Sequence, residues 1–176
     1  MKYLLLINII QNLGGNAMKE LEKAIELRRE GNLKESNEIL VDLVNKYPDD
    51  PMINFHCAWS YDALGLERNA VEYYKKAISL GLPDEELRYA YIGLGSTYRT
   101  LGQYNESREV LEEGLSKFQQ DKAMAVFYAM TLYNSNEYSK AMEILLKIVA
   151  ETSFDEGIRK YKRAIEFYSD KLDEVW

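Results

Sequence analysis

The chain has few of the residues that carry most enzyme chemistry. It contains one cysteine, Cys57, and one histidine, His56, among 176 residues. A lone cysteine forms no internal disulfide, which favours a reducing compartment, and we therefore expect a cytoplasmic protein. Because the two residues are adjacent, their side chains point to different sides of a helix and cannot pair as nucleophile and base. Cys57 is interpreted as a small packing residue.

Motifs for metal and phosphate binding are also missing. The sequence contains no H-x-x-x-H, no C-x-x-C, no glycine-rich phosphate loop and no calcium-loop spacing of acids. Its paired acids, such as Glu85-Glu86 and Glu112-Glu113, fall at expected helix starts or solvent faces, where charge usually serves solvation. We therefore expect no enzyme activity, no catalytic residue, no metal and no cofactor.

The charge balance and the hydrophobic runs exclude two classes of partner. With 29 acidic and 22 basic side chains the net charge is −7, whereas binding a phosphate backbone needs clustered Lys and Arg. The only basic cluster, at 159–163, is short. The apolar run from Tyr3 to Ile10 is too short to span a bilayer, which takes roughly 20 residues. We expect neither nucleic acid nor membrane as a partner.

Residues 1–17 do not share the pattern of the rest of the chain. They could be a cleaved signal peptide, with Lys2 ahead of the apolar run and Gly15-Asn16-Ala17 before the cut. The interpretation we favour is a non-native leader at a mis-assigned start. Codons for 13–17 can spell a bacterial ribosome-binding site ahead of Met18, which would then be the true first residue.

The remaining chain repeats. Only 3 prolines interrupt it, which suits long helices. Gly31, Gly65, Gly102 and Asn136 follow one another at steps of 34, 37 and 34 residues. Gly and Asn tolerate the left-handed backbone that ends many helices, so each marks a turn between two helices. A near-constant period of this size predicts a stacked array of helix pairs.

Apolar positions at helical spacing predict the helices themselves. The first pair breaks at Gly31-Asn32, and the later helices are expected at about 51–64, 67–80, 84–100, 104–118, 122–134, 138–151 and 154–172. The units are about 17–50, 51–83, 84–121 and 122–155, followed by a capping helix at 156–176. Helix starts are assigned to Asp50, Asp121 and two capping boxes, Asn32 with Glu35 and Ser153 with Glu156.

Small residues recur where the two helices of a pair must approach closely. They are Ala58, Ala70, Ala77, Gly95, Ser107, Gly114, Ala129 and Ala141. An arginine at Ala70 or Gly95 is predicted to unfold the array, because it would overpack the contact and bury an unpaired charge.

These residues resemble tetratricopeptide repeats. The match is strongest in Leu94-Gly95-Ser96-Thr97-Tyr98-Arg99-Thr100-Leu101-Gly102-Gln103-Tyr104, and with Leu80-Gly81-Leu82-Pro83 it also resembles a short bacterial group of undefined activity. The resemblance implies an all-α fold, an α-solenoid of about four antiparallel helix pairs with a C-terminal capping helix.

The resemblance further implies a concave groove lined by the first helix of each unit. It places in this groove Met52, Phe55, Trp59, Asp62, Tyr89, Ile92, Arg99, Val126, Met130 and Tyr133. The implied function is a non-catalytic scaffold that binds a protein or peptide partner, with Phe55 and Trp59 as anchors and Arg99 orienting a carboxylate. A chaperone C-terminus is not expected, because Leu21, Ile25, Phe55 and Trp59 occupy the positions of the usual polar cluster.

Two alternatives leave the groove without a foreign partner. The last helix could fold across it, or two copies of the chain could pair through it, and the aromatic residues would then be core. The chain could also be a homodimerising or peptide-sensing regulatory protein. The sequence does not choose among these hypotheses.

Overall fold

The computed structural model describes residues 15–175, and this part of the chain is all helical. Its nine helices are α2 (Gly15–Arg29), α3 (Leu33–Lys46), α4 (Pro51–Ala63), α5 (Glu67–Leu80), α6 (Asp84–Thr100), α7 (Tyr104–Lys117), α8 (Lys122–Asn134), α9 (Tyr138–Thr152) and α10 (Glu156–Tyr168). Of the predicted leader only residues 15–17 fall within this range. They begin α2, and Ala17 is buried.

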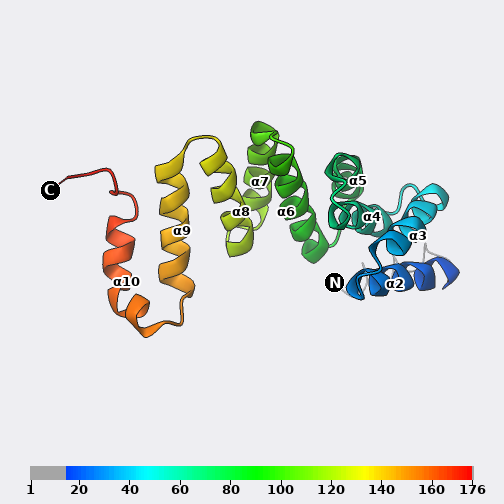
Figure 1. The fold of residues 1–176 in the computed structure, drawn as a ribbon, viewed down its shortest axis with the longest axis horizontal. Coiled ribbons are helices and arrows are strands. Elements are labelled where there is room, and N and C mark those ends of the chain that lie inside the picture. Colours follow the sequence, from blue (N-terminus) through cyan, green and yellow to red (C-terminus); the bar gives the residue numbers. More distant parts are fainter. Residues whose placement is uncertain (1–14, 176) are drawn as a thin grey trace.

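Successive helices form antiparallel pairs that stack into an elongated, curved ribbon (Figure 1). The pairs are α2 with α3, α4 with α5, α6 with α7, and α8 with α9. The first helices of neighbouring pairs also touch, since α4 contacts α6 and α6 contacts α8. This arrangement confirms the predicted α-solenoid.

The turns within the pairs have the backbone that their residue types predict. Gly31, Gly65 and Gly102 have φ values of 87°, 70° and 75°, and Asn136 has 63°. Asn136 is the one non-glycine residue with positive φ in the described chain. Asparagine adopts this conformation more readily than most side chains, which explains why it can replace glycine in the fourth pair.

Two of the predicted helix caps are confirmed. The Asp50 carboxylate accepts from the Ile53 amide at 2.8 Å, and Asp121 accepts from the Met124 amide at 2.8 Å. Pro51 follows Asp50 at the first helical position, where no amide hydrogen is needed.

The two predicted capping boxes are wrong. Asn32 has a ψ of 59° rather than an extended backbone, and its side chain donates to Glu30 instead of accepting from the helix. The last helix begins later than predicted, at Glu156, because Asp155 is the cap and accepts from the Ile158 amide at 3.0 Å. Ser153 only accepts from the Asp155 amide.

Small residues allow the close helix contacts that were predicted. All eight lie in the buried interior. A Cβ at Gly95 would lie 2.5 Å from Leu111 Cγ, and one at Gly114 would lie 2.6 Å from Met124 Sδ. The interior is therefore packed too tightly at these two glycines to admit even a methyl group without movement.

Serine replaces alanine at this contact in the first and third pairs, and both hydroxyls are satisfied. Ser36 donates to the Ala24 carbonyl at 2.7 Å, and Ser107 donates to the Gly95 carbonyl at 2.7 Å. Ser107 also lies 2.8 Å from the Thr131 hydroxyl, so it links α7 to α8. The substitution costs little because no buried hydroxyl is left unpaired.

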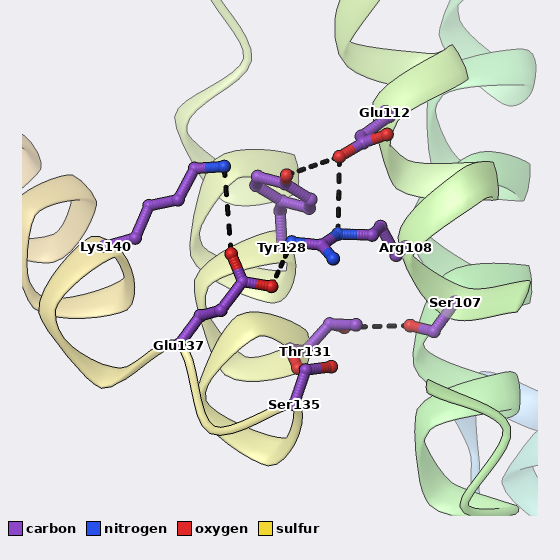
Figure 2. A network of polar contacts seen from close by, with 8 residues as sticks. All are labelled: Ser107, Arg108, Glu112, Tyr128, Thr131, Ser135, Glu137 and Lys140. Carbon is purple, nitrogen blue, oxygen red and sulfur yellow. Dashed lines mark hydrogen bonds and ion pairs between the residues drawn. The ribbon is translucent and has the colours of Figure 1, made fainter. Parts of the chain in front are cut away.

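A polar network on the surface joins the third and fourth pairs (Figure 2). Arg108 of α7 forms ion pairs with Glu112 and with Glu137, and Glu137 also contacts Lys140. The Tyr128 hydroxyl of α8 donates to Glu112 at 2.5 Å. The side of α8 that faces α7 is thus held by charge as well as by packing.

Helix α10 ends the ribbon and packs on α9, at the opposite end from α2 (Figure 1). None of its residues is buried, and Tyr161 is 61% exposed. The apolar side chains of α10 and of the residues after it are therefore only partly covered: Ile158 and Ile165 are half-buried, whereas Tyr161, Tyr168 and Leu172 are exposed. The helix does not fold across α4 and α6, so it leaves that part of the concave face open.

Candidate functional site

The ten predicted groove residues lie on three first helices. Helix α4 carries Met52, Phe55, Trp59 and Asp62, α6 carries Tyr89, Ile92 and Arg99, and α8 carries Val126, Met130 and Tyr133. The structure brings five of them together around one cavity. The other five do not line it, and Met52 packs against the core beside Ile53 and Phe55.

The first cavity lies between α4 and α6 and has a volume of about 380 Å³. Its lining is Phe55, Trp59, Asp62, Ala63, Tyr74, Tyr89, Ile92, Gly93, Ser96 and Phe127. Trp59 is 42% exposed and Tyr89 46%, whereas Phe55 is 2% exposed. Phe55 is therefore part of the floor, and the exposed aromatic surface belongs to Trp59 and Tyr89.

Asp62 is the charged group of this cavity. Its carboxylate accepts from the Tyr74 hydroxyl at 2.8 Å and from the Thr97 hydroxyl at 2.9 Å. Partial burial raises the pKa of Asp62, and the two hydroxyl bonds act in the opposite direction. Within residues 15–175 no Lys or Arg lies at ion-pair distance from it.

Sequence reasoning did not assign Thr97 or Tyr74 to this site. Tyr74 is buried, as a packing residue would be, but its hydroxyl also reaches Asp62. Thr97 had a signal that could have been used, since Ser60, Thr97 and Thr131 recur at the repeat spacing. All three are buried, and a hydroxyl recurring at a buried repeat position indicates a repeated polar contact.

A second cavity, of about 550 Å³, adjoins the first on the side of α2. It is lined by Ile25, Arg28, Arg29, Leu33, His56, Trp59 and Ala63. The Arg28 guanidinium lies 4.1 Å from the centroid of the Trp59 ring, which is cation–π geometry. Trp59 and Ala63 border both cavities, so the two hollows share one wall.

His56 orients the Arg28 guanidinium. Arg28 Nη2 lies 3.3 Å from His56 Nδ1, and Nη1 donates to the His56 carbonyl at 3.4 Å. Burial, together with the nearby charges of Arg28 and Arg29, lowers the pKa of His56 to about 3. The imidazole is therefore neutral at physiological pH, and its Nδ1 can accept from Arg28.

The part of the concave face on α8 is more exposed and has fewer polar contacts. Tyr133 packs edge-on against Tyr138 of α9, with ring centroids 4.9 Å apart. Arg99 donates to the Asn134 side chain at 3.3 Å, and its buried Nε has no hydrogen-bond partner. Arg99 thus connects α6 to α8.

Three negative observations concern residues 15–175. They contain no group of three or more His, Cys, Asp or Glu placed to hold a metal ion. Burial raises the pKa of the Cys57 thiol to about 12, so this cysteine is not a nucleophile at neutral pH. None of the helices here combines the length and the apolar character that crossing a bilayer would take.

Comparison with known families settles the nature of the array. A family model described as Tetratrico peptide repeat matches residues 51–172. The chain belongs to the tetratricopeptide repeat family. No curated protein matches it.

Solved structures with the same fold support this assignment. MamA from Desulfovibrio magneticus RS-1, residues 41 to the end, superposes with a TM-score of 0.71 at 17% identity, over 91% of this chain and 89% of that one. YrrB, described as a TPR protein with an unusual peptide-binding site, gives 0.66 at 14% identity, over 88% and 79%. The Cut9–Hcn1 hetero-tetramer of the APC/C gives 0.69 at 16% identity, over 85% of this tetratricopeptide repeat chain and 29% of the other.

Proposed function

We propose that the chain is a non-catalytic interaction module that binds a segment of a partner protein on its concave face, in the cytoplasm of a bacterium. The binding surface is formed by α4 and α6 and extends to α8. Tetratricopeptide repeat arrays in general mediate protein–protein interaction, and one structural neighbour is described as having a peptide-binding site.

The observation that carries the proposal is the cavity between α4 and α6. It combines an apolar floor with two aromatic side chains, Trp59 and Tyr89, that stand about half in solvent. Aromatic anchors in a concave, largely apolar pocket are the usual source of binding energy at peptide interfaces. Since α10 packs on α9, nothing from the described chain fills this cavity.

The test is affinity capture with the full chain and two variants. Trp59→Ala removes the wall shared by both cavities, whereas Tyr161→Ala removes a more exposed aromatic residue on α10, away from them. We expect partners of the wild-type chain to be lost with Trp59→Ala and retained with Tyr161→Ala. If both variants retain every partner, the proposed surface is wrong.

Light scattering of the same samples tests pairing of two copies through the concave face. A dimer that Trp59→Ala converts to a monomer would mean that the surface serves homodimerisation instead.

A further inference from the structure

Arg28 and Asp62 are charged groups on the concave face that form no ion pair within residues 15–175. Arg28 and Asp62 lie on either side of Trp59, each beside one of the two cavities. Residues 28 and 62 are 34 positions apart, so they occupy the same place in consecutive units. Arg28 is basic and Asp62 is acidic, so the cavity beside α2 carries a positive charge and the cavity between α4 and α6 carries a negative one.

Arg28 has donors to spare. Its two contacts to His56 use one hydrogen from each terminal nitrogen, so Nε and the remaining terminal hydrogens are available. The neighbouring Arg29 is already paired with Glu26 at 3.2 Å. Burial lowers the pKa of Arg28, which reflects a guanidinium partly removed from water without a counter-charge. Stacking on Trp59 offsets only part of this cost.

Asp62 has the complementary arrangement. Its two hydroxyl partners are neutral, so the negative charge is hydrogen-bonded but not compensated. A cation from another molecule would gain a charge-assisted contact in a half-buried site, where such contacts are stronger than in water.

The spacing of the two sites sets the length of what can join them. The Arg28 guanidinium lies 4.1 Å from the centroid of the Trp59 ring, and Trp59 and Asp62, which are neighbours on α4, have Cβ atoms about 5–6 Å apart. An extended peptide advances about 3.3 Å per residue, so about two to four residues bridge the two positions. Between them lies Trp59, which favours an apolar side chain.

We propose that the concave face selects segments in which an acidic side chain is followed or preceded, at about two to four residues, by a basic one, with an apolar residue between. The acidic side chain pairs with Arg28, the apolar one packs on Trp59, and the basic one pairs with Asp62. This inference rests on the proposed function and specifies the chemistry of its partner.

The test uses a phage-displayed library of random peptides, fused to the coat protein through their C-termini so that any carboxylate selected near the pattern is a side chain. The full-length chain is the bait. We expect enriched peptides to share the acidic–apolar–basic pattern. Synthetic copies are then measured against the wild type, Arg28→Gln, Asp62→Asn and a matched control, Arg159→Gln, on the exposed surface of α10.

The expected result is a pair of specific couplings. Changing the acidic residue of the peptide to its amide should weaken binding to the wild type about tenfold, and should have little further effect on Arg28→Gln. Replacing the basic residue of the peptide with a neutral one should likewise weaken binding to the wild type and should have little further effect on Asp62→Asn alone. Arg28→Lys, which keeps the charge, should keep the preference for an acidic residue, and Arg159→Gln should behave as wild type.

Other outcomes separate the two proposals. Enriched peptides that need Trp59 but show no coupling to Arg28 or Asp62 would overturn the charge pattern and leave the peptide-binding surface standing. A library that yields no binder for a folded wild-type chain would overturn both.

Discussion

Helices α6 and α10 hold corresponding places in the array, yet they bury very different amounts of surface. Helix α6 packs against α4, α5, α7 and α8 and has five buried residues, whereas α10 packs on α9 and has none. The residue type at one repeat position, where a first helix contacts the following helix, differs between these helices. Gly95 in α6 and Ala129 in α8 correspond to Arg163 in α10. A repeat becomes a terminal cap when the side facing a further helix becomes polar.

This difference teaches where the stability of the array resides. A unit of the array is stabilised by the neighbours that cover it, and the central units have two neighbours whereas the terminal ones have one. Substitutions of the same type should therefore have large effects on α5 to α7 and small effects on α10.

The largest difference in stability is expected between two variants in which arginine replaces a buried alanine or an exposed one. Ala70 of α5 is fully buried, and Ala70→Arg should cost more than about 4 kcal/mol, because it overpacks the core and buries a charge. Ala164→Arg on α10 places the same side chain in solvent and should change stability by less than about 0.5 kcal/mol. Urea unfolding followed by circular dichroism measures both. Equal midpoints would contradict the comparison.

Acid should weaken the centre of the array through His56. The pKa of this residue is lowered from 6.5 to about 3 in the folded chain, first by burial and then by Arg28 and Arg29. Between these values only the unfolded chain binds the proton, so stability is full above the unfolded pKa and is lost as the pH falls. At about pH 4.5 the loss should be about 2–3 kcal/mol relative to neutral pH.

The variant His56→Gln isolates this effect from other groups that titrate in the same range, among them Asp62, whose pKa is raised. Between neutral pH and about pH 4.5, this variant should lose about 2–3 kcal/mol less of its free energy of unfolding than the wild type loses. Parallel pH profiles for the two proteins would show that His56 is not the titrating group.

A methyl group should have a large effect on stability at one glycine and a small effect at another. Gly95→Ala would place a Cβ 2.5 Å from Leu111 Cγ and should destabilise the chain by about 1–3 kcal/mol. Gly157→Ala, in the first turn of α10, would place a Cβ 3.0 Å from Asp155 Oδ1, the oxygen that caps this helix. Alanine favours helix over glycine by up to about 1 kcal/mol, and crowding of the capping oxygen opposes this gain, so the net change should be close to zero. Thermal melting measures both.

The sequence predicted the array because its signals are local. Helical spacing, four turn residues and eight small residues each report on one helix pair, and the structure confirms all three. The capping boxes failed because several polar residues near a helix start compete for the same amides. At the last helix Asp155 is the cap rather than Ser153.

The concave site was less predictable because it depends on contacts between helices. Repeat position alone places Phe55 in the groove, but the side chains packed around it leave it only 2% exposed. The bonds from Tyr74 and Thr97 to Asp62, and the stacking of Arg28 on Trp59, join residues 12 to 35 positions apart. The Tyr74 bond joins the two helices of one pair and the other two contacts join neighbouring pairs, so all three depend on helix packing that a single sequence does not state.

The smallest difference in stability between the centre of the array and α10 is expected when one ion pair is removed from each. Arg108 links α7 to Glu137, the residue at the N-cap of α9, and also contacts Glu112 (Figure 2). Lys162 of α10 pairs with Glu166 within its own helix, at 3.7 Å. Because Arg108 joins a network and is partly covered, Arg108→Gln should cost about 1 kcal/mol, and this cost should shrink at high salt.

The matching change Lys162→Gln should be close to neutral, since an exposed pair within one helix contributes about 0.3–0.5 kcal/mol at most. Urea unfolding at low and high salt measures both variants. If Lys162→Gln cost as much as Arg108→Gln, α10 would be held as firmly as the centre, and the distinction between the two regions would not apply to their charges.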